Sequence, residues 1–346
     1  QYPGEAALTR NNSEDEHYGM RVLITRDNFE NCGCGGFAYL TSFNDVGDYS
    51  KPAFVFNTGL VSAGEAISHE AGHTLGLHHD GGAGTGYYTG HGGGETGWAP
   101  IMGVGYYRSL VQWSKGEYSG ATQGEDDLAR ISLYGANLLA DDHADFDGAA
   151  SPLTVDYVNG ERVFLAGSGS IRRSDDIDVF SFVTDGSLVQ IIVSPAPYSP
   201  NLDIKADLYD SSGRLLASVN PVDTLSATVN VALEAGEYFV RVDGVGKTPV
   251  SGHEGYSDYG SVGRYTVYAN VKDPGELAAP VAVAAAPDYA AQTAPLYVGF
   301  DGSASIDADG HVVAWNWDFG DGTSGSGALV NHEYNSPGVY TVTLTV

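Results

Sequence analysis

The sequence predicts a multidomain chain with an α+β N-terminal domain at 1–148 and two all-β domains at 149–272 and 295–346. Three observations support this division. Short apolar runs and helix signals alternate in the first part, and strand-like runs recur about every 8–15 residues in the second. A Pro/Ala-rich segment at 273–294, expected to be a linker, then precedes a last group of strand-like runs. A chain of 346 residues has room for two or three such domains.

The amino-acid composition and net charge argue against some classes of binding partner. Sixteen basic and 44 acidic residues give a net charge of −28. This balance argues against nucleic acid and against anionic membranes, because both attract cationic groups. It fits calcium binding, or simply the acidic surface of a salt-tolerant secreted protein. No run approaches the roughly 20 apolar residues that span a bilayer, so we expect no membrane span.

Three short runs in the first domain predict β-strands. They are 20–25 (MRVLIT), 36–41 (GFAYLT) and 53–57 (AFVFN), each rich in β-forming apolar residues and bounded by turn residues.

Two segments of the same domain predict helices. In 62–77 (SAGEAISHEAGHTLGL), Ser62 followed by Glu65 predicts a capping box, and Gly76 lies where a left-handed stop is expected. A closing helix is predicted at 125–139 (EDDLARISLYGANLL), which has acidic residues in its first turn and apolar residues at helical spacing.

The first helix carries a metal-binding pattern, HEAGHTLGLHHD at 69–80. His69 and His73 are four residues apart, so their imidazoles lie on one helix face and can share one ion. Glu70 follows the first ligand and can accept a proton from water whose pKa bound zinc lowers to about 7. The pattern therefore predicts one catalytic zinc ion with Glu70 as general base.

Two histidines leave a catalytic zinc ion one protein ligand short. Gly76 can adopt positive φ and turn the chain back, so that His79 supplies the third nitrogen. His78, its neighbour, is then expected to point elsewhere.

The full pattern resembles the active-site consensus of the metzincin zinc peptidases, and the Asp after the last histidine resembles their reprolysin/adamalysin-like branch. The resemblance implies that the three histidines bind zinc and that Asp80 is a structural carboxylate under the site. It also implies a methionine turn below the metal, for which Met102 in APIMGVGYY is the candidate. No tyrosine stands two residues after Met102, so the tyrosine ligand of some metzincins is not matched.

The run GFAYLTSF resembles the edge strand that pairs with an extended substrate in this family. The resemblance implies that Gly36, Phe37, Ala38 and Tyr39 bind substrate, with Tyr106 lining the pocket wall. An ordinary sheet edge is the alternative.

The resemblance also implies that part of the domain is missing at its N-terminal end, because the family places two strands and a long helix before the strand expected at 20–25. The chain starts without a signal peptide. We expect a secreted, extracellular bacterial protein from which the signal and any propeptide have been removed.

The downstream regions resemble two known β-domains. Residues 149–272 are similar to the bacterial pre-peptidase C-terminal (PPC) domain, which implies a jelly-roll-like sandwich that accompanies secretion or is removed during maturation. Residues 295–346, with WDFGDG, closely resemble an immunoglobulin-like PKD domain, of a type associated with insoluble substrates. In it Trp317 would fill the core, and the glycines at 320 and 322 would shape a turn. Asp307 and Asp309 would be turn residues.

Two further features leave alternatives open. The acidic run DDHADFD at 141–147 and Asp175, Asp176 and Asp178 are candidate calcium ligands, or simply solvated linker groups. Cys32 and Cys34 are too close for a C-x-x-C motif and form either a local disulfide or two free thiols.

The leading hypothesis is a secreted, monomeric zinc endopeptidase that acts on protein or peptide substrates and contacts an insoluble matrix through its PKD domain. An adhesion protein with a vestigial peptidase region is the alternative from another class. A zinc hydrolase of non-peptide substrates is a third.

Overall fold

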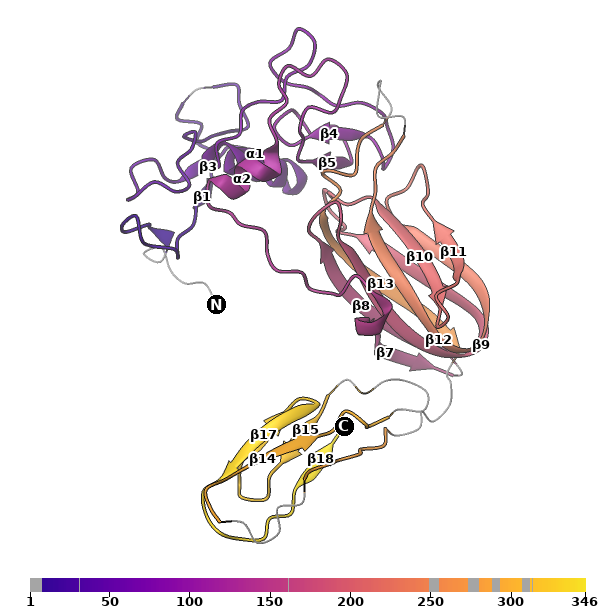
Figure 1. Cartoon of the computed structure of the whole chain (residues 1–346). Coiled ribbons are helices and arrows are strands. Elements are labelled where there is room, and N and C mark those ends of the chain that lie inside the picture. The colour runs from indigo at the N-terminus through magenta and orange to yellow at the C-terminus, as the bar shows by residue number, and fades with distance from the viewer. Residues whose placement is uncertain are drawn as a thin grey trace.

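The computed structural model describes residues 8–30, 32–160, 162–248, 255–272, 280–287, 293–306, 312 and 314–346. These form an N-terminal unit, a middle unit called the β-sandwich below, and a small C-terminal unit (Figure 1). The described residues are mostly β, with a small α+β N-terminal region, in agreement with the predicted fold class. No helix within these ranges is long and apolar enough to cross a membrane.

The N-terminal unit contains a sheet of three short strands in the order β1-β3-β2. They are β1 (Val22–Ile24), β2 (Gly36–Phe37) and β3 (Ala53–Val55), and each lies inside one of the predicted runs. The central strand β3 runs parallel to β1 and antiparallel to β2. Thus β2 is an edge strand of the sheet, as expected.

Helix α1 (Leu60–Thr74) carries the metal-binding pattern, but it begins earlier than predicted. Gly59 is its N-cap and no side chain caps it, so the predicted capping box is wrong. The Ser62 hydroxyl, already inside the first turn, donates to the Gly59 carbonyl at 3.3 Å. Glu65 is instead buried. After the helix, Gly76 has φ +87°, the left-handed conformation that was predicted.

The second helix, α2 (Asp127–Leu133), is shorter than the predicted 125–139. The Asp126 side chain caps it by accepting from the Ala129 amide at 2.9 Å. Gly135, at φ +104°, follows the helix end and turns the chain away before the remaining predicted residues. Between the two helices lie the paired parallel strands β4 (Trp98–Pro100) and β5 (Leu110–Gln112).

The β-sandwich consists of eight strands that share one core. Its two longest strands, β9 and β12, pair along nearly their whole length, and each takes part in two layers. One layer has the order β11-β10-β12-β9-β6, and the other β12-β9-β13-β8-β7. Gly186, at φ +87°, lies between the two halves of β9. The strands are β6 (Ser151–Pro152), β7 (Thr154–Asn159), β8 (Arg162–Ile171), β9 (Ile177–Pro195), β10 (Ile204–Asp210), β11 (Leu215–Val219), β12 (Ala227–Gly244) and β13 (Gly263–Lys272), preceded by the 3₁₀ turn η2 (Asp147–Ala149).

The C-terminal unit packs two small sheets, β14-β17 and β16-β15-β18, around one aromatic core. Trp317 is 1% exposed at its centre, as predicted. Gly320 and Gly322 have φ +75° and +89°, which is consistent with the predicted turn. Asp307 and Asp309 lie outside the described residues. The strands are β14 (Leu296–Asp301), β15 (Asn316–Asp318), β16 (Ser324–Ser326), β17 (Leu329–Tyr334) and β18 (Thr343–Thr345).

The segment expected as a linker, 273–294, is described at 280–287 and 293–294. Two isolated bridges join it to the C-terminal unit, Val281 to Ile306 and Ala285 to Asp301. Part of this segment therefore pairs with the unit that follows it.

Candidate metal centre

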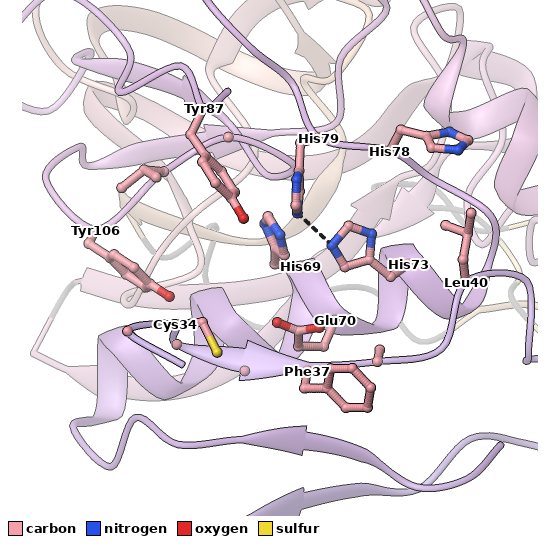
Figure 2. A pocket seen from close by; sticks show the side chains of 16 residues that line it. Cys34, Phe37, Leu40, His69, Glu70, His73, His78, His79, Tyr87 and Tyr106 are labelled. Atoms are coloured by element: carbon pink, nitrogen blue, oxygen red, sulfur yellow. Dashed lines mark hydrogen bonds between the residues drawn. The ribbon is translucent and has the colours of Figure 1, made fainter. Parts of the chain in front are cut away.

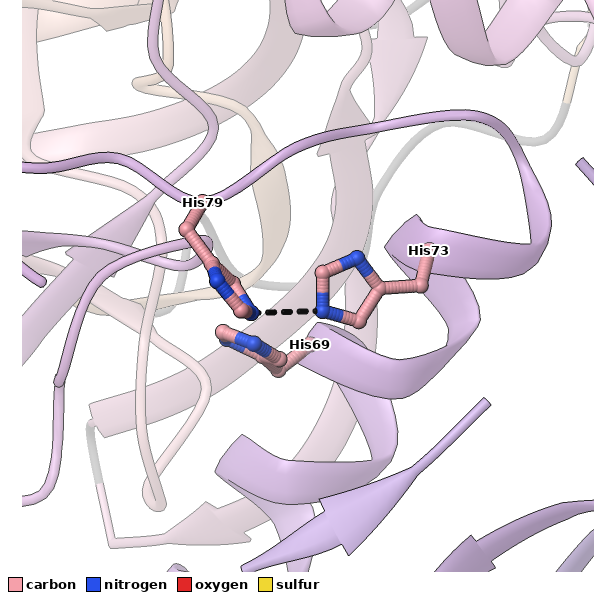
Figure 3. Close-up of side chains that lie close together, drawn as sticks. All are labelled: His69, His73 and His79. Atoms are coloured by element: carbon pink, nitrogen blue, oxygen red, sulfur yellow. Dashed lines mark hydrogen bonds between the residues drawn. The ribbon is translucent and has the colours of Figure 1, made fainter. Parts of the chain in front are cut away.

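Three histidines converge on one point at the end of α1. His69 and His73 project from successive turns of the helix, and the chain returns after Gly76 to bring His79 opposite them (Figure 3). One ring nitrogen from each lies within 4.8 Å of the others. The Nε2 atoms of His73 and His79 are 2.9 Å apart. This arrangement can hold one metal ion.

The second nitrogen of two of these rings contacts a backbone carbonyl. Nδ1 of His69 lies 2.8 Å from the Ile101 oxygen, and Nδ1 of His73 lies 2.8 Å from the Leu77 oxygen. A carbonyl only accepts, so Nδ1 carries the proton in both rings and Nε2 presents a lone pair. Burial lowers the pKa of His69 to about 3 and that of His79 to about 4. The rings are therefore neutral near pH 7, and the donor set fits zinc.

Glu70 is buried beside the triad, where its carboxylate faces the same cavity (Figure 2). Burial raises the pKa of its carboxyl to about 7. Edge strand β2 approaches Glu70 very closely at Gly36. A Cβ atom on Gly36 would lie 2.6 Å from Glu70 Oε1 and 2.6 Å from the Phe54 carbonyl oxygen. Glycine is therefore required for β2 to reach the site.

The cavity has a volume of about 690 Å³ and contains most of the expected substrate-binding residues. Gly36, Phe37, Ala38 and Tyr106 line it. Tyr39 does not, because its ring is 48% exposed and packs edge-on against Phe37, with centroids 5.1 Å apart. The opposite wall comes from Gly103, Val104 and Tyr87.

Two of the expected supporting residues, Met102 and Asp80, are buried next to the segment that carries the histidines. Met102 is 0% exposed, and a Cβ atom on Gly72 of α1 would lie 2.5 Å from its sulfur. The Asp80 amide donates to the Met102 carbonyl oxygen at 2.9 Å. Burial raises the pKa of the Asp80 carboxyl to about 7, and the Glu125 charge adds to the effect. The Asp80 side chain is also contacted by Tyr118 Oη at 3.5 Å.

Tyr87 is a site residue that the sequence pattern did not indicate. Its ring packs on His79 with centroids 4.2 Å apart, and its hydroxyl points into the cavity beside His69 (Figure 2). Tyr87 comes from the glycine-rich loop after the motif. A loop has no regular side-chain periodicity, so the sequence does not show which way this ring points. The only available signal was the pair of tyrosines, Tyr87 and Tyr88, among glycines.

His78 and the cysteines occupy the rim. The His78 ring is turned away from the triad, and its amide donates to Glu125 Oε2 at 2.9 Å (Figure 2). Cys32 and Cys34 form a disulfide, one of the two states left open by the sequence, and Cys34 lines the cavity.

A group of three acidic residues lies where the connector meets the start of β9. One carboxylate oxygen each from Asp141, Asp176 and Asp178 lies within 4.8 Å of the others. Asp176 and Asp178 are 1% and 0% exposed, and Oδ1 of each finds no hydrogen-bond partner among the described residues. Asp175, by contrast, is exposed and pairs with Arg173 at 2.9 Å. Of the acidic residues named as candidate calcium ligands, Asp176 and Asp178 are therefore buried, whereas Asp175 is exposed to solvent.

Comparisons with known proteins match both ends of the chain to protein families. Residues 2–80 match the family described as Metallo-peptidase family M12B Reprolysin-like, and residues 277–346 match the PKD domain. Collagenase ColA of Clostridium perfringens is 49% identical over 49 residues, which are 14% of this chain and 4% of that protein.

Two solved structures resemble about a third of the chain. One is the pre-peptidase C-terminal domain of a collagenase from Bacillus anthracis, with TM-score 0.25 and 15% identity over 35% of this chain and 93% of that one. The other is PliG of Aeromonas hydrophila, a periplasmic inhibitor of g-type lysozyme, with TM-score 0.23 and 12% identity over 35% and 95%. By its family matches, this chain carries a reprolysin-like metallopeptidase segment at its N-terminal end and a PKD domain at its C-terminal end.

Proposed function

We propose that this chain is a secreted zinc endopeptidase with Glu70 as general base. The observation that carries the proposal is the convergence of three histidine nitrogens and the Glu70 carboxylate on one cavity. The match of residues 2–80 to a metallopeptidase family supports the same reaction class.

The residues have distinct tasks in this mechanism. His69, His73 and His79 would hold zinc, with two of the rings oriented by backbone carbonyls. When bound there, zinc polarises a carbonyl group and makes water more acidic. Glu70 accepts a proton from the attacking water and delivers it to the amine nitrogen that leaves. Burial raises the pKa of this carboxyl to about 7, and the charge of a bound zinc ion would favour its ionised, proton-accepting form.

The substrate in this proposal is an extended polypeptide. Edge strand β2 pairs with β3 on one side, and its residues line the cavity with their neighbours Ala38 and Leu40. An extended peptide can add to such an edge through main-chain hydrogen bonds. This favours a peptidase over a zinc hydrolase of non-peptide substrates.

The test combines metal analysis with hydrolysis of casein or gelatin. The native chain should contain one zinc ion and cleave, and a chelated sample should not. Glu70→Gln should keep zinc but lose about 10² to 10⁴ in rate, since it removes the proton acceptor and keeps the shape. Stoichiometric zinc without chelator-sensitive, Glu70-dependent cleavage would refute the peptidase and favour the adhesion alternative.

We also propose that Asp141, Asp176 and Asp178 bind calcium. Two buried carboxylates with unpartnered oxygens repel each other unless a cation neutralises them, and oxygen clusters are the sites that calcium prefers. Calcium added to chelated protein should raise the unfolding temperature of the unaltered chain. Asp178→Asn should abolish that rise, whereas the matched control Asp175→Asn should keep it. Equal unfolding temperatures with and without calcium would refute the site.

The matrix role of the PKD domain is proposed from its family match and from the name of the collagenase relative. Cosedimentation with insoluble collagen tests it. Retention of the full chain, and loss of retention after deletion of 277–346, is the expected result.

A further inference from the structure

We propose that the β-sandwich is a permanent support of the metal centre and remains bound to the N-terminal unit even when the connecting chain is cut. This differs from the role of a removable or purely secretory domain. The part concerning zinc rests on the proposed function, whereas the association of the two units does not.

The two units share a hydrophobic cluster. Trp98, Leu110 and Tyr118 come from the N-terminal unit, and Leu225 and Tyr256 come from loops of the β-sandwich. All five are at most 6% exposed. Separation of the units would expose this cluster to water, which is unfavourable in proportion to the apolar area.

A chain of hydrogen bonds runs from the β-sandwich to the first zinc ligand. Gln112 of β5 donates through Nε2 to the Asn201 carbonyl at 2.7 Å, and its Oε1 accepts from Trp98 Nε1 at 2.8 Å. The Gln112 backbone carbonyl accepts from the Ile101 amide at 2.8 Å. The Ile101 carbonyl in turn lies 2.8 Å from His69 Nδ1. The β-sandwich thus positions His69 through one buried glutamine.

The β-sandwich also contributes hydrogen bonds to the N-terminal end of α2. The Tyr259 hydroxyl donates to Asp126 Oδ1 at 2.7 Å and accepts from the Leu128 amide at 2.8 Å. Further polar contacts lie around the shared cluster. They join His91 Nε2 to the Gly255 carbonyl at 2.8 Å, Lys247 Nζ to Thr96 Oγ1 at 2.9 Å, and the Leu225 amide to Glu95 Oε2 at 3.3 Å.

The backbones of the two units approach more closely than a side chain would permit. A Cβ atom on Gly260 would lie 2.4 Å from the Trp113 carbonyl oxygen and 2.7 Å from Gln112 Cβ. Such an approach is typical of one folded body, because loosely tethered domains meet through side chains and water.

The connector allows a direct test of association. A specific protease site is inserted between Leu139 and Ala140, in an exposed stretch without secondary structure. After complete cleavage, the two pieces should elute together from a sizing column under native conditions and separate in denaturant. Elution as two folded pieces under native conditions would overturn the proposal. The experiment needs neither zinc nor substrate, so its result is independent of the proposed peptidase activity.

The second test addresses the positioning role in the full chain. Gln112→Leu keeps the side-chain volume but breaks the bonds to Asn201 and Trp98. Gln190→Leu is the matched control, because Gln190 lies on the exposed face of the β-sandwich and contacts Asn230 there. Transfer of zinc to a coloured chelator should become about tenfold faster in Gln112→Leu, the lower end of the range for groups that orient a ligand. It should be unchanged in Gln190→Leu. Equal rates in both variants would refute the positioning role.

Discussion

The Nε2 atoms of His73 and His79 face each other across 2.9 Å, although the two residues lie on either side of the turn at Gly76. Because His73 carries its proton on Nδ1, its Nε2 has a lone pair. The facing Nε2 of His79 either donates its proton to this lone pair or, with its proton on Nδ1, presents a lone pair of its own. In the second tautomer the two nitrogens are placed to bind one metal ion.

This geometry distinguishes the two adjacent histidines. His79→Ala should lose zinc, because it removes one of three converging nitrogens. His78→Ala should retain zinc, because that ring faces Glu125. Metal content after exhaustive dialysis measures both. Zinc loss from His78→Ala, or full retention by His79→Ala, would contradict the assignment.

Tyr87 is expected to take part in catalysis as a hydrogen-bond donor. Its hydroxyl points into the cavity beside His69, where it can donate to an oxygen that becomes negative in the transition state. Tyr87→Phe keeps the ring that packs on His79, so zinc content and KM should stay the same. The value of kcat should fall by about 10², as for the loss of one oxyanion donor. Tyr107→Phe is the control, because Tyr107 is 76% exposed. A rise in KM or a loss of zinc without a fall in kcat would indicate a merely structural role.

Two glycines of α1 provide a matched test of packing over Met102. A Cβ atom on Gly64 meets nothing within 4 Å, whereas one on Gly72 would overlap the Met102 sulfur. Gly64→Ala should stabilise the protein by about 0.5 to 1 kcal/mol through helix propensity. Gly72→Ala should destabilise it by about 1 to 3 kcal/mol, because Met102 is fully buried. Thermal unfolding measures both changes, and equal shifts would contradict the packing.

Asp203 should make stability depend on pH. Burial raises the pKa of its carboxyl from the usual 3.8 to about 6, and Tyr256 Oη donates to it at 2.7 Å. The folded protein therefore keeps this proton at pH values where the unfolded chain has lost it. The contribution of Asp203 to stability should fall as pH rises from about 4 to 6, by at most about 3 kcal/mol, and remain constant above that.

The variant Asp203→Asn isolates this contribution. Its unfolding temperature relative to the unaltered chain should increase between pH 4 and pH 7, with chelator present throughout. A difference that does not change with pH would show that Asp203 ionises equally easily in both states.

The local sequence predicts those features of the structure that depend only on residues close together in the chain. The four-residue spacing of His69 and His73 and the left-handed turn at Gly76 follow from helix geometry and from the freedom of glycine. The ends of the helices were predicted less well. The spacing of Ser62 and Glu65 predicts a cap at Ser62, but the helix starts before this residue and buries Glu65 instead.

The sequence by itself determined the nature and order of the candidate metal ligands and of the carboxylate beside them, and it predicted an α+β region followed by β-rich regions. These depend on spacing within single segments. Only the tertiary structure decided that Tyr87 packs on His79, that Gly36 lies against Glu70, and that Gln112 donates to the Asn201 carbonyl. Such contacts join residues from separate segments, and their formation depends on how whole sheets and loops pack, which no local pattern records.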